Sequence, residues 1–257
     1  MAPLLGQCDD NFAKAAALIA QTAKAEHPDV ILLPELWNAG FFPKDAAGCA
    51  DENGARTRAM MAELAKEYAV NLVAGSVITS RGGRVYNTAY VFDRAGDCIA
   101  SYDKTHLFTP MGEDRTFAAG DALCRFRLDD GVNCAIIVCY DLRFPELVRT
   151  LALPGLDVLF VPAEWPDKRI VHLKTLARAR AIENQMFLAL SNGCGMANDT
   201  RFGGNSGILD PWGEWLAEAG AEETAITAEL DLATLTKIRS TIPVFADRRP
   251  ELYDVDN

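Results

Sequence analysis

Short apolar runs of strand length recur along the chain and alternate with segments of helical periodicity. The strands that this pattern predicts cover 28–37, 71–79, 84–92, 97–102, 123–128, 132–139, 155–162 and the runs MFLALSN, SGILD and TAITAELD. The predicted helices cover 11–26 with Asn11 as N-cap, 52–69, 144–153, 168–184 and 232–240. Because the strands form two sets, each accompanied by helices, we expect an α/β fold in which two sheets pack face to face with helices outside.

The chain shows no internal boundary. No linker rich in Gly, Ser or Pro divides the 257 residues, so we expect one domain over 1–257 with an extended tail at 241–257. The runs DVILLP (29–34) and DVLFVP (157–162) echo each other. A pseudo-symmetric fold produces such an echo, and so do two buried strands that each end at proline.

Charge and composition exclude several classes of function. The net charge of −11 is spread along the chain without a basic stripe, which argues against nucleic acid and anionic membrane as partners. We find neither a signal peptide nor an apolar run near the ~20 residues that span a bilayer. Seven scattered cysteines and three histidines do not form a zinc pattern. We therefore expect reduced thiols, a cytoplasmic location and no metal.

Three predicted strands end next to a reactive side chain. Glu35 follows VILLP, Lys104 follows CIASYD, and Cys139 follows AIIV. A carboxylate near a thiol can accept its proton and so activate the sulfur as a nucleophile. A nearby lysine favours the thiolate and faces the oxyanion of a tetrahedral intermediate, with the backbone N–H of Tyr140 as second donor.

Ordinary structural interpretations of these residues stay open at this point. Glu35 and Lys104 also fit an ion pair at the mouth of a strand, and Cys139 also fits a buried structural thiol. Neither His106 nor His172 lies in a local pattern typical of a cysteine–histidine dyad. We expect a set of charged residues to form salt bridges that brace the turn after Cys139 and the next helix: Arg143, Glu146, Arg178, Arg180 and Glu183.

Six motifs in register carry a resemblance that spans nearly the whole chain. They are LLPELW, YDKTHLF, CYDLRFPEL, RARAIENQ, DPWGE and IPVFADRRPELY. Together they resemble the nitrilase superfamily of carbon–nitrogen hydrolases. The resemblance implies an α-β-β-α sandwich that commonly dimerises, a Glu-Lys-Cys triad at Glu35, Lys104 and Cys139, and no cofactor. It also implies a second glutamate after the lysine, for which Glu113 in PMGEDRTF is the candidate.

The same resemblance implies the reaction: Cys139 attacks an amide, ammonia leaves, and water activated by Glu35 hydrolyses the thioester. Nitrilases have Cys-Trp-Glu where this chain has Cys-Tyr-Asp, which favours an amidase. VPAEWPDKRIVHL and the segment after 221 are similar to the ω-amidase branch, which cuts 2-oxoglutaramate or 2-oxosuccinamate. Deaminated glutathione amidase, carbamoylase, nitrilase, a catalytically silent binding protein and a thiol-redox protein are the alternatives.

A carboxylate-bearing substrate requires a local cation in this acidic protein. The cations near the expected site loops are Lys168, Arg169, His172 and Arg115. We predict that Arg169 binds the carboxylate and that Trp165 forms a pocket wall. The full set of predicted substrate-binding residues is Arg169, Trp165, Glu164, His172 and Arg115.

The chain departs from the family pattern at its start. Family members begin with an apolar strand that ends in Gln, whereas this chain opens at MAPLLGQCDDNF. We therefore expect either that Met1 is an internal methionine or that one sheet lacks this strand, which leaves an edge or a gap that costs stability.

Overall fold

The computed structural model describes residues 1–253 of the chain. The helices are α1 (Cys8–Glu26), α2 (Ala55–Tyr68), α3 (Pro145–Ala152), α4 (Ile170–Asn184) and α5 (Thr234–Thr241). The strands are β1 (Val30–Leu32), β2 (Asp51–Glu52), β3 (Asn71–Arg81), β4 (Arg84–Phe92), β5 (Cys98–Asp103), β6 (Arg125–Arg127), β7 (Asn133–Ile136), β8 (Val158–Ala163), β9 (Phe187–Asn192), β10 (Cys194–Ala197), β11 (Thr200–Gly203), β12 (Gly207–Leu209) and β13 (Trp215–Glu218). Most sequence-predicted elements are confirmed, with ends shifted by a few residues.

The first sheet follows the order β1-β3-β4-β5, with β2 also paired to β3. β1 and β2 run parallel to β3, whereas β3–β4 and β4–β5 are antiparallel. The β3–β4 hairpin turns through Gly82 and Gly83 at φ of 55° and 76°, the positive φ values that a two-residue hairpin loop requires.

The second sheet follows the order β13-β12-β9-β8-β7-β6. β7, β8 and β9 run parallel to one another, and the remaining pairs are antiparallel. The parallel strands β8 and β9 are apolar and largely buried because the sheet is covered on both faces.

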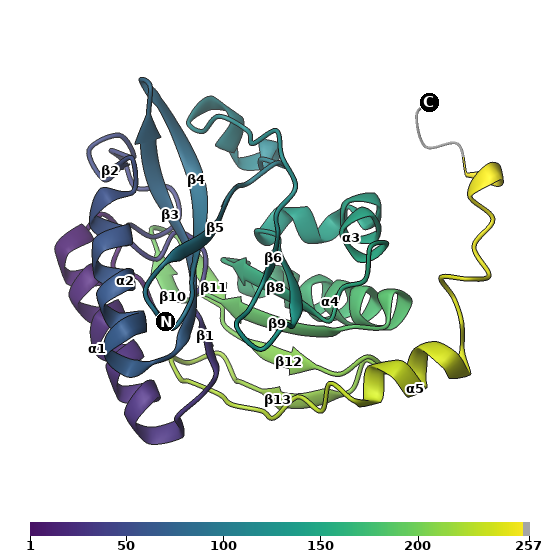
Figure 1. Cartoon of the computed structure of the whole chain (residues 1–257). Coiled ribbons are helices and arrows are strands. Elements are labelled where there is room, and N and C mark those ends of the chain that lie inside the picture. Colours follow the sequence, from purple (N-terminus) through teal and green to yellow (C-terminus); the bar gives the residue numbers. More distant parts are fainter. Residues whose placement is uncertain (254–257) are drawn as a thin grey trace.

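The two sheets pack against each other with helices outside (Figure 1). Phe12 and Ile19 of α1 and Met61 of α2 share one apolar cluster with Leu72 and Phe92 of the first sheet. A second cluster joins the inner face of that sheet to the second sheet and to α3 and α4. The predicted sandwich of two mixed sheets is confirmed.

The predicted N-cap at Asn11 is wrong. Helix α1 begins at Cys8, with Gln7 at the N-cap position, because Asp9 and Asp10 in the first turn already favour a helix start there. Asn11 is buried inside the helix, where its amide bonds the backbone of Leu4 and of Asn38.

The strand predicted at TAITAELD (224–231) is also wrong. The segment has the alternating burial of an extended chain but no strand assignment in the described structure. Alternation selects an extended backbone, whereas a strand also needs a neighbouring chain for its hydrogen bonds. Within residues 1–253 no strand precedes α1; Met1 O instead accepts a bond from Cys194 N at 3.1 Å.

The chain leaves the body of the fold after α5 (Figure 1). Residues 242–253 extend outward and contain one short 3-10 turn, Pro250–Leu252. The last part of the predicted tail, 254–257, lies outside the described residues. Among helices of residues 1–253, none is long and apolar enough to cross a membrane.

Candidate active site

Glu35 follows β1 in a segment that a bulge of β3 holds in place. Gly75 lies in this bulge at φ +62°, where a Cβ would stand 2.1 Å from Pro34 O, so only glycine allows the two backbones to approach this closely. Ser76 N donates to Pro34 O at 3.1 Å, and the Ser76 hydroxyl accepts from Leu36 N at 3.0 Å. The backbone around Glu35 is thus fixed on both sides, and the side chain is fully buried.

Lys104 follows β5 and lies between two carboxylates. Its backbone N–H donates to Asn87 O at 2.9 Å, and its side chain is fully buried. Lys104 Nζ donates to Glu35 Oε1 at 2.9 Å and to Glu113 Oε1 and Oε2 at 2.9 and 2.8 Å. Three of the predicted site residues therefore form one buried ionic cluster.

Asn87 of β4 completes this cluster and was missed by the sequence analysis. Its Nδ2 donates to Glu35 Oε1 at 2.8 Å and to Glu113 Oε1 at 3.4 Å. Phe108 N donates a hydrogen bond to Glu113 Oε2 at 2.5 Å. The available signal was a polar amide in the middle of the apolar strand RVYNTAYVF.

Cys139 lies beyond β7, which ends at Ile136 rather than at the cysteine as predicted. It begins a 3-10 turn, Cys139–Arg143, which we call the nucleophile turn, and its φ is +51°. A non-glycine residue at positive φ is strained, and such strain is typical of functional sites. The sequence-based strand continued too far because 136–138 are all apolar, whereas the backbone leaves the sheet before the thiol.

The thiol of Cys139 lies beside Glu35 and Lys104. Burial, and then the negative charge of Glu35, raise the pKa of Cys139 well above its ordinary value; Lys104 and the backbone N–H of Glu164 oppose this shift. Glu35 Oε2 has no hydrogen-bond partner in residues 1–253. The resting site therefore holds a neutral thiol next to a carboxylate oxygen that is free to accept its proton.

The charge state of Lys104 is set by its neighbours. Burial alone lowers the pKa of Lys104, but the negative charges of Glu35 and Glu113 outweigh burial and raise it. Burial raises the pKa of Glu113, against the lowering effect of Lys104. Lys104 therefore stays cationic.

Asp141, which the sequence analysis left without a role, ties the nucleophile turn to the segment around Lys104. This carboxylate is fully buried. Oδ2 accepts from Val138 N and from Tyr102 Oη, both at 2.8 Å. Oδ1 contacts Thr105 Oγ1 at 3.1 Å, His106 N at 3.0 Å and His106 Nδ1 at 2.8 Å. Since YDKTH and CYD come from different sheets, Asp141 fixes the position of Cys139 relative to Lys104.

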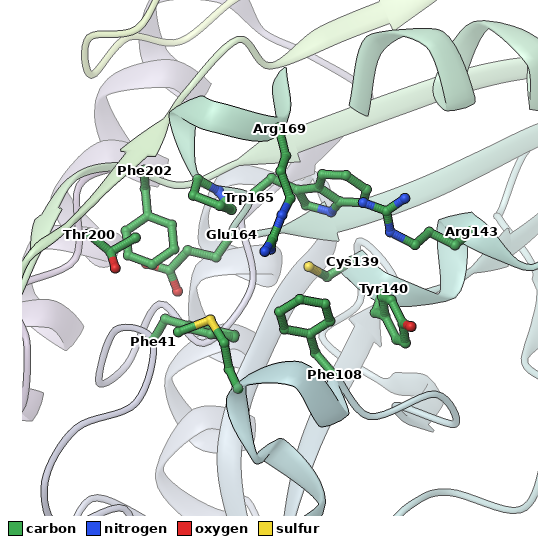
Figure 2. A pocket seen from close by; sticks show the side chains of 12 residues that line it. Phe41, Phe108, Cys139, Tyr140, Arg143, Glu164, Trp165, Arg169, Thr200 and Phe202 are labelled. Carbon is green, nitrogen blue, oxygen red and sulfur yellow. The ribbon is translucent and has the colours of Figure 1, made fainter. Parts of the chain in front are cut away.

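Cys139 opens into a pocket between the two sheets' strand ends (Figure 2). Of the predicted binding residues, Arg169, Trp165 and Glu164 line this pocket, whereas His172 and Arg115 are exposed and do not. The other lining residues are Phe41, Phe108, Met111, Tyr140, Arg143, Pro166, Thr200 and Phe202. The pocket wall is thus largely aromatic, with few charged groups.

The prediction that Arg143 braces the fold through a salt bridge is wrong. Its guanidinium lies 4.5 Å over the Trp165 ring, and that of Arg169 lies 5.0 Å over the Phe108 ring. Neither has an ion pair among the described residues. Burial, and the positive charge of Arg169, lower the pKa of Arg143. Two guanidiniums without a carboxylate partner therefore face one pocket (Figure 2).

Arg180 does have the bracing role predicted for it. Its Nε donates to Leu142 O of the nucleophile turn at 3.1 Å, and its Nη1 pairs with Glu183 Oε1 at 2.8 Å. The aromatic stacking of Arg143, in contrast, was not visible in the sequence because Trp165 lies on a different element.

Among residues 1–253, Glu164 is the one acidic group that lines the pocket. Its side chain is 3% exposed, and its Oε2 has no partner within the described part of the chain. Burial, and then Glu35, raise the pKa of Glu164 well above its ordinary value. Gly193 leaves it room, because a Cβ there would stand 2.9 Å from Glu164 Cγ.

Cys134, the thiol nearest to Cys139 in the sequence, lies away from the site. In residues 1–253 no group of three or more His, Cys, Asp or Glu side chains is arranged to hold a metal ion. Cys134 is fully buried in the core, where its Sγ contacts Val132 O at 3.6 Å, and does not line the pocket.

Comparison with known proteins gives a consistent result. Residues 2–240 match the model of the carbon-nitrogen hydrolase family. The chain is 44% identical to the 2-oxoglutaramate amidase of Bacillus subtilis (strain 168), over 96% of this chain and 95% of the relative. It is 32% identical to the omega-amidase NIT2 of Homo sapiens, over 96% and 92% of the two chains.

Solved structures agree in fold. The crystal structure of Nit3 from Saccharomyces cerevisiae, a nitrilase-superfamily member, matches with a TM-score of 0.89 at 26% identity, over 96% of this chain and 93% of that one. A mutant amidase from Nesterenkonia sp. AN1, with acrylamide added at its active-site cysteine, matches with a TM-score of 0.86 at 27% identity, over 98% and 94%.

Proposed function

The chain belongs to the carbon–nitrogen hydrolase family and is an amide hydrolase, and we propose that it cuts the terminal amide of a small carboxylate-bearing substrate such as 2-oxoglutaramate or 2-oxosuccinamate. One observation carries this proposal: the pocket holds two guanidiniums without carboxylate partners at its wall and Cys139 at its base. The similarity to relatives named for 2-oxoglutaramate and ω-amide hydrolysis supports it.

In the proposed binding mode, Arg169 and Arg143 bind the substrate carboxylate, and the amide carbon lies over Cys139. Paired guanidinium–carboxylate bonds fix the orientation of a small planar group. Trp165 and Phe108 support this arrangement, because the Trp165 ring contacts the Arg143 guanidinium and the Phe108 ring contacts the Arg169 guanidinium.

In the proposed mechanism, Glu35 Oε2 takes the thiol proton as the sulfur attacks the amide carbon. Lys104 Nζ and the Tyr140 backbone N–H bind the oxyanion. Glu35 then gives its proton to the amide nitrogen, the C–N bond breaks, and ammonia leaves a thioester. A water that loses its proton to Glu35 hydrolyses the thioester, while Glu113 holds Lys104 in position throughout.

The direct test is ammonia release from 2-oxoglutaramate by the wild type and Cys139→Ala. We expect rapid release that falls to background in the variant, since loss of the nucleophile removes the covalent route. Deaminated glutathione, a larger amide, is the parallel substrate. Release from deaminated glutathione alone moves the chain to that activity, and silence on both from folded protein refutes the substrate proposal.

The carboxylate-binding role is tested separately with Arg169→Gln. We expect KM for 2-oxoglutaramate to rise roughly 10- to 100-fold, from loss of a charged hydrogen bond, while turnover of a neutral amide such as butyramide is unchanged. Lys168→Gln is the matched control, because this adjacent lysine is exposed and lies outside the pocket. Equal effects of the two substitutions contradict the assignment.

Oligomeric state and location belong to the same proposal. Exposed apolar side chains on the extended segment, Ile242 and Leu252, support a homodimer or larger homo-oligomer, which sedimentation tests directly. Seven free cysteines support a cytoplasmic location, because reducing compartments keep thiols unpaired.

A further inference from the structure

Two cysteines outside the active site lie next to each other in space. Cys8 begins α1, and Cys49 lies in the loop that follows Glu35. Both Sγ atoms lie 4.0 Å from the same carbonyl oxygen, that of Gly6, so the two thiols are neighbours. Both side chains are half-buried, so a small reagent can reach them.

The backbones that carry these thiols are held in place by other contacts. Asn11, on the first turns of α1, bonds Asn38 O at 3.1 Å, and Asn38 Nδ2 bonds Cys49 O at 3.3 Å. Both cysteines pack against the apolar cluster that contains Phe41 and Phe202. The backbones that carry the two thiols are therefore fixed relative to each other.

The remaining cysteines lack this arrangement. In the part of the chain that the structure describes, no two of Cys98, Cys124, Cys134 and Cys194 share one acceptor atom. Cys98 and Cys134 contact backbone carbonyl oxygens instead.

We propose that Cys8 and Cys49 form an oxidisable dithiol, which peroxide converts to an intramolecular disulfide that links the start of α1 to the loop carrying Phe41. Both sulfurs face one oxygen atom from 4.0 Å, and the side chains must rotate toward each other to reach the S–S bond length of about 2 Å. This site is separate from the proposed amidase chemistry and does not involve Cys139.

The order of the reaction follows from the environment of Cys8. Burial, and then the neighbouring Cys49 thiol, raise the pKa of Cys8 to about 12, so Cys8 stays protonated and Cys49 reacts first. The Cys49 sulfur attacks one peroxide oxygen, the O–O bond breaks, and the products are a sulfenic acid and water. The Cys8 sulfur then attacks the sulfenic sulfur, gives up its proton and expels a second water. Two electrons pass from the thiols to peroxide.

The experiment uses full-length Cys139→Ala protein, so that the reactive pocket thiol does not consume peroxide. After treatment with hydrogen peroxide, we expect a mass loss of two hydrogens, a non-reduced peptide joining residue 8 to residue 49, and reversal by dithiothreitol. Closing this loop raises Tm by roughly 5–10 °C. Adding Cys8→Ser or Cys49→Ser abolishes both effects, whereas Cys134→Ser, a matched change at a distant thiol, abolishes neither.

The contrary results are equally specific. A disulfide between other cysteines, a covalent dimer, oxygen addition at Cys49 without cross-linking, or no reaction of the folded protein each overturns the proposal. The peptide map of Cys139→Ala decides the matter even where a serine variant folds poorly.

Discussion

Replacing Asp141 by Asn tests whether one buried carboxylate holds the nucleophile turn to the lysine segment. The substitution keeps the volume and removes the charge. An amide has one acceptor oxygen, so its NH₂ group must face one of the two sets of donors that Asp141 now binds. If NH₂ replaces Oδ2, it faces Val138 N–H, which donates at 2.8 Å in the native protein and cannot rotate away.

The expected loss follows from these bonds. One orphaned buried N–H costs about 1–3 kcal/mol, and the bonds that remain to Thr105 and His106 lose their charged acceptor, at a few tenths to about 1 kcal/mol each. The total is about 3 kcal/mol. At roughly 2–4 °C per kcal/mol for a chain of this size, Tm falls by about 6–12 °C. If the NH₂ group instead takes the place of Oδ1, it faces the His106 N–H, which then has no acceptor. The loss of stability is no smaller in that case.

Two assays separate stability from geometry. Calorimetry gives the Tm shift, with Asp121→Asn as control, because Asp121 is exposed and loses the same charge. Steady-state kinetics well below the melting temperature then gives kcat. We expect kcat to fall roughly 10- to 100-fold with little change in KM, since a small displacement of Cys139 misaligns the attack while the pocket arginines are untouched. A Tm within about 2 °C of wild type together with native kcat would falsify this account.

Four further outcomes follow from the site. In thermal melts, Glu164→Gln stabilises the protein relative to wild type above about pH 5 but not near pH 4. The raised pKa of Glu164 makes the folded state bind more protons than the unfolded state. The stability of the wild type therefore falls as pH rises, and the variant avoids this loss. An equal Tm difference at all pH values contradicts that reasoning. Lys104→Met abolishes turnover and lowers the unfolding free energy by about 3–5 kcal/mol in urea, because it leaves two buried carboxylates uncompensated; unchanged stability argues against a charged cluster. Gly75→Ala costs more than about 3 kcal/mol, since its Cβ meets Pro34 O, and wild-type melting disproves the close approach. Cys139→Ala leaves Tm within a few degrees of wild type, because one small side chain is replaced by a slightly smaller one. A large drop in Tm shows that the thiol is structural.

Much of the fold was readable from local pattern. β4 was predicted with its observed bounds, 84–92, because the turn at Gly82 and Gly83 marks its start. The failures have different causes. TAITAELD alternates like a strand but has no neighbouring strand to pair with in the described structure. Asn11 is a good N-cap type, but α1 begins earlier, at Cys8, and the Asn11 amide bonds Leu4 and Asn38 instead.

The sequence by itself determined the layered α/β architecture and the placing of Glu35, Lys104 and Cys139 within a few residues after strands, because periodicity is a local property. Only the tertiary structure decided what surrounds them. It buried Lys104 between Glu35 and Glu113, turned Arg143 from an expected brace into a pocket wall, and left His172 and Arg115 outside. These outcomes depend on which side chains from separate sheets meet, and therefore on packing and desolvation, which no single segment contains.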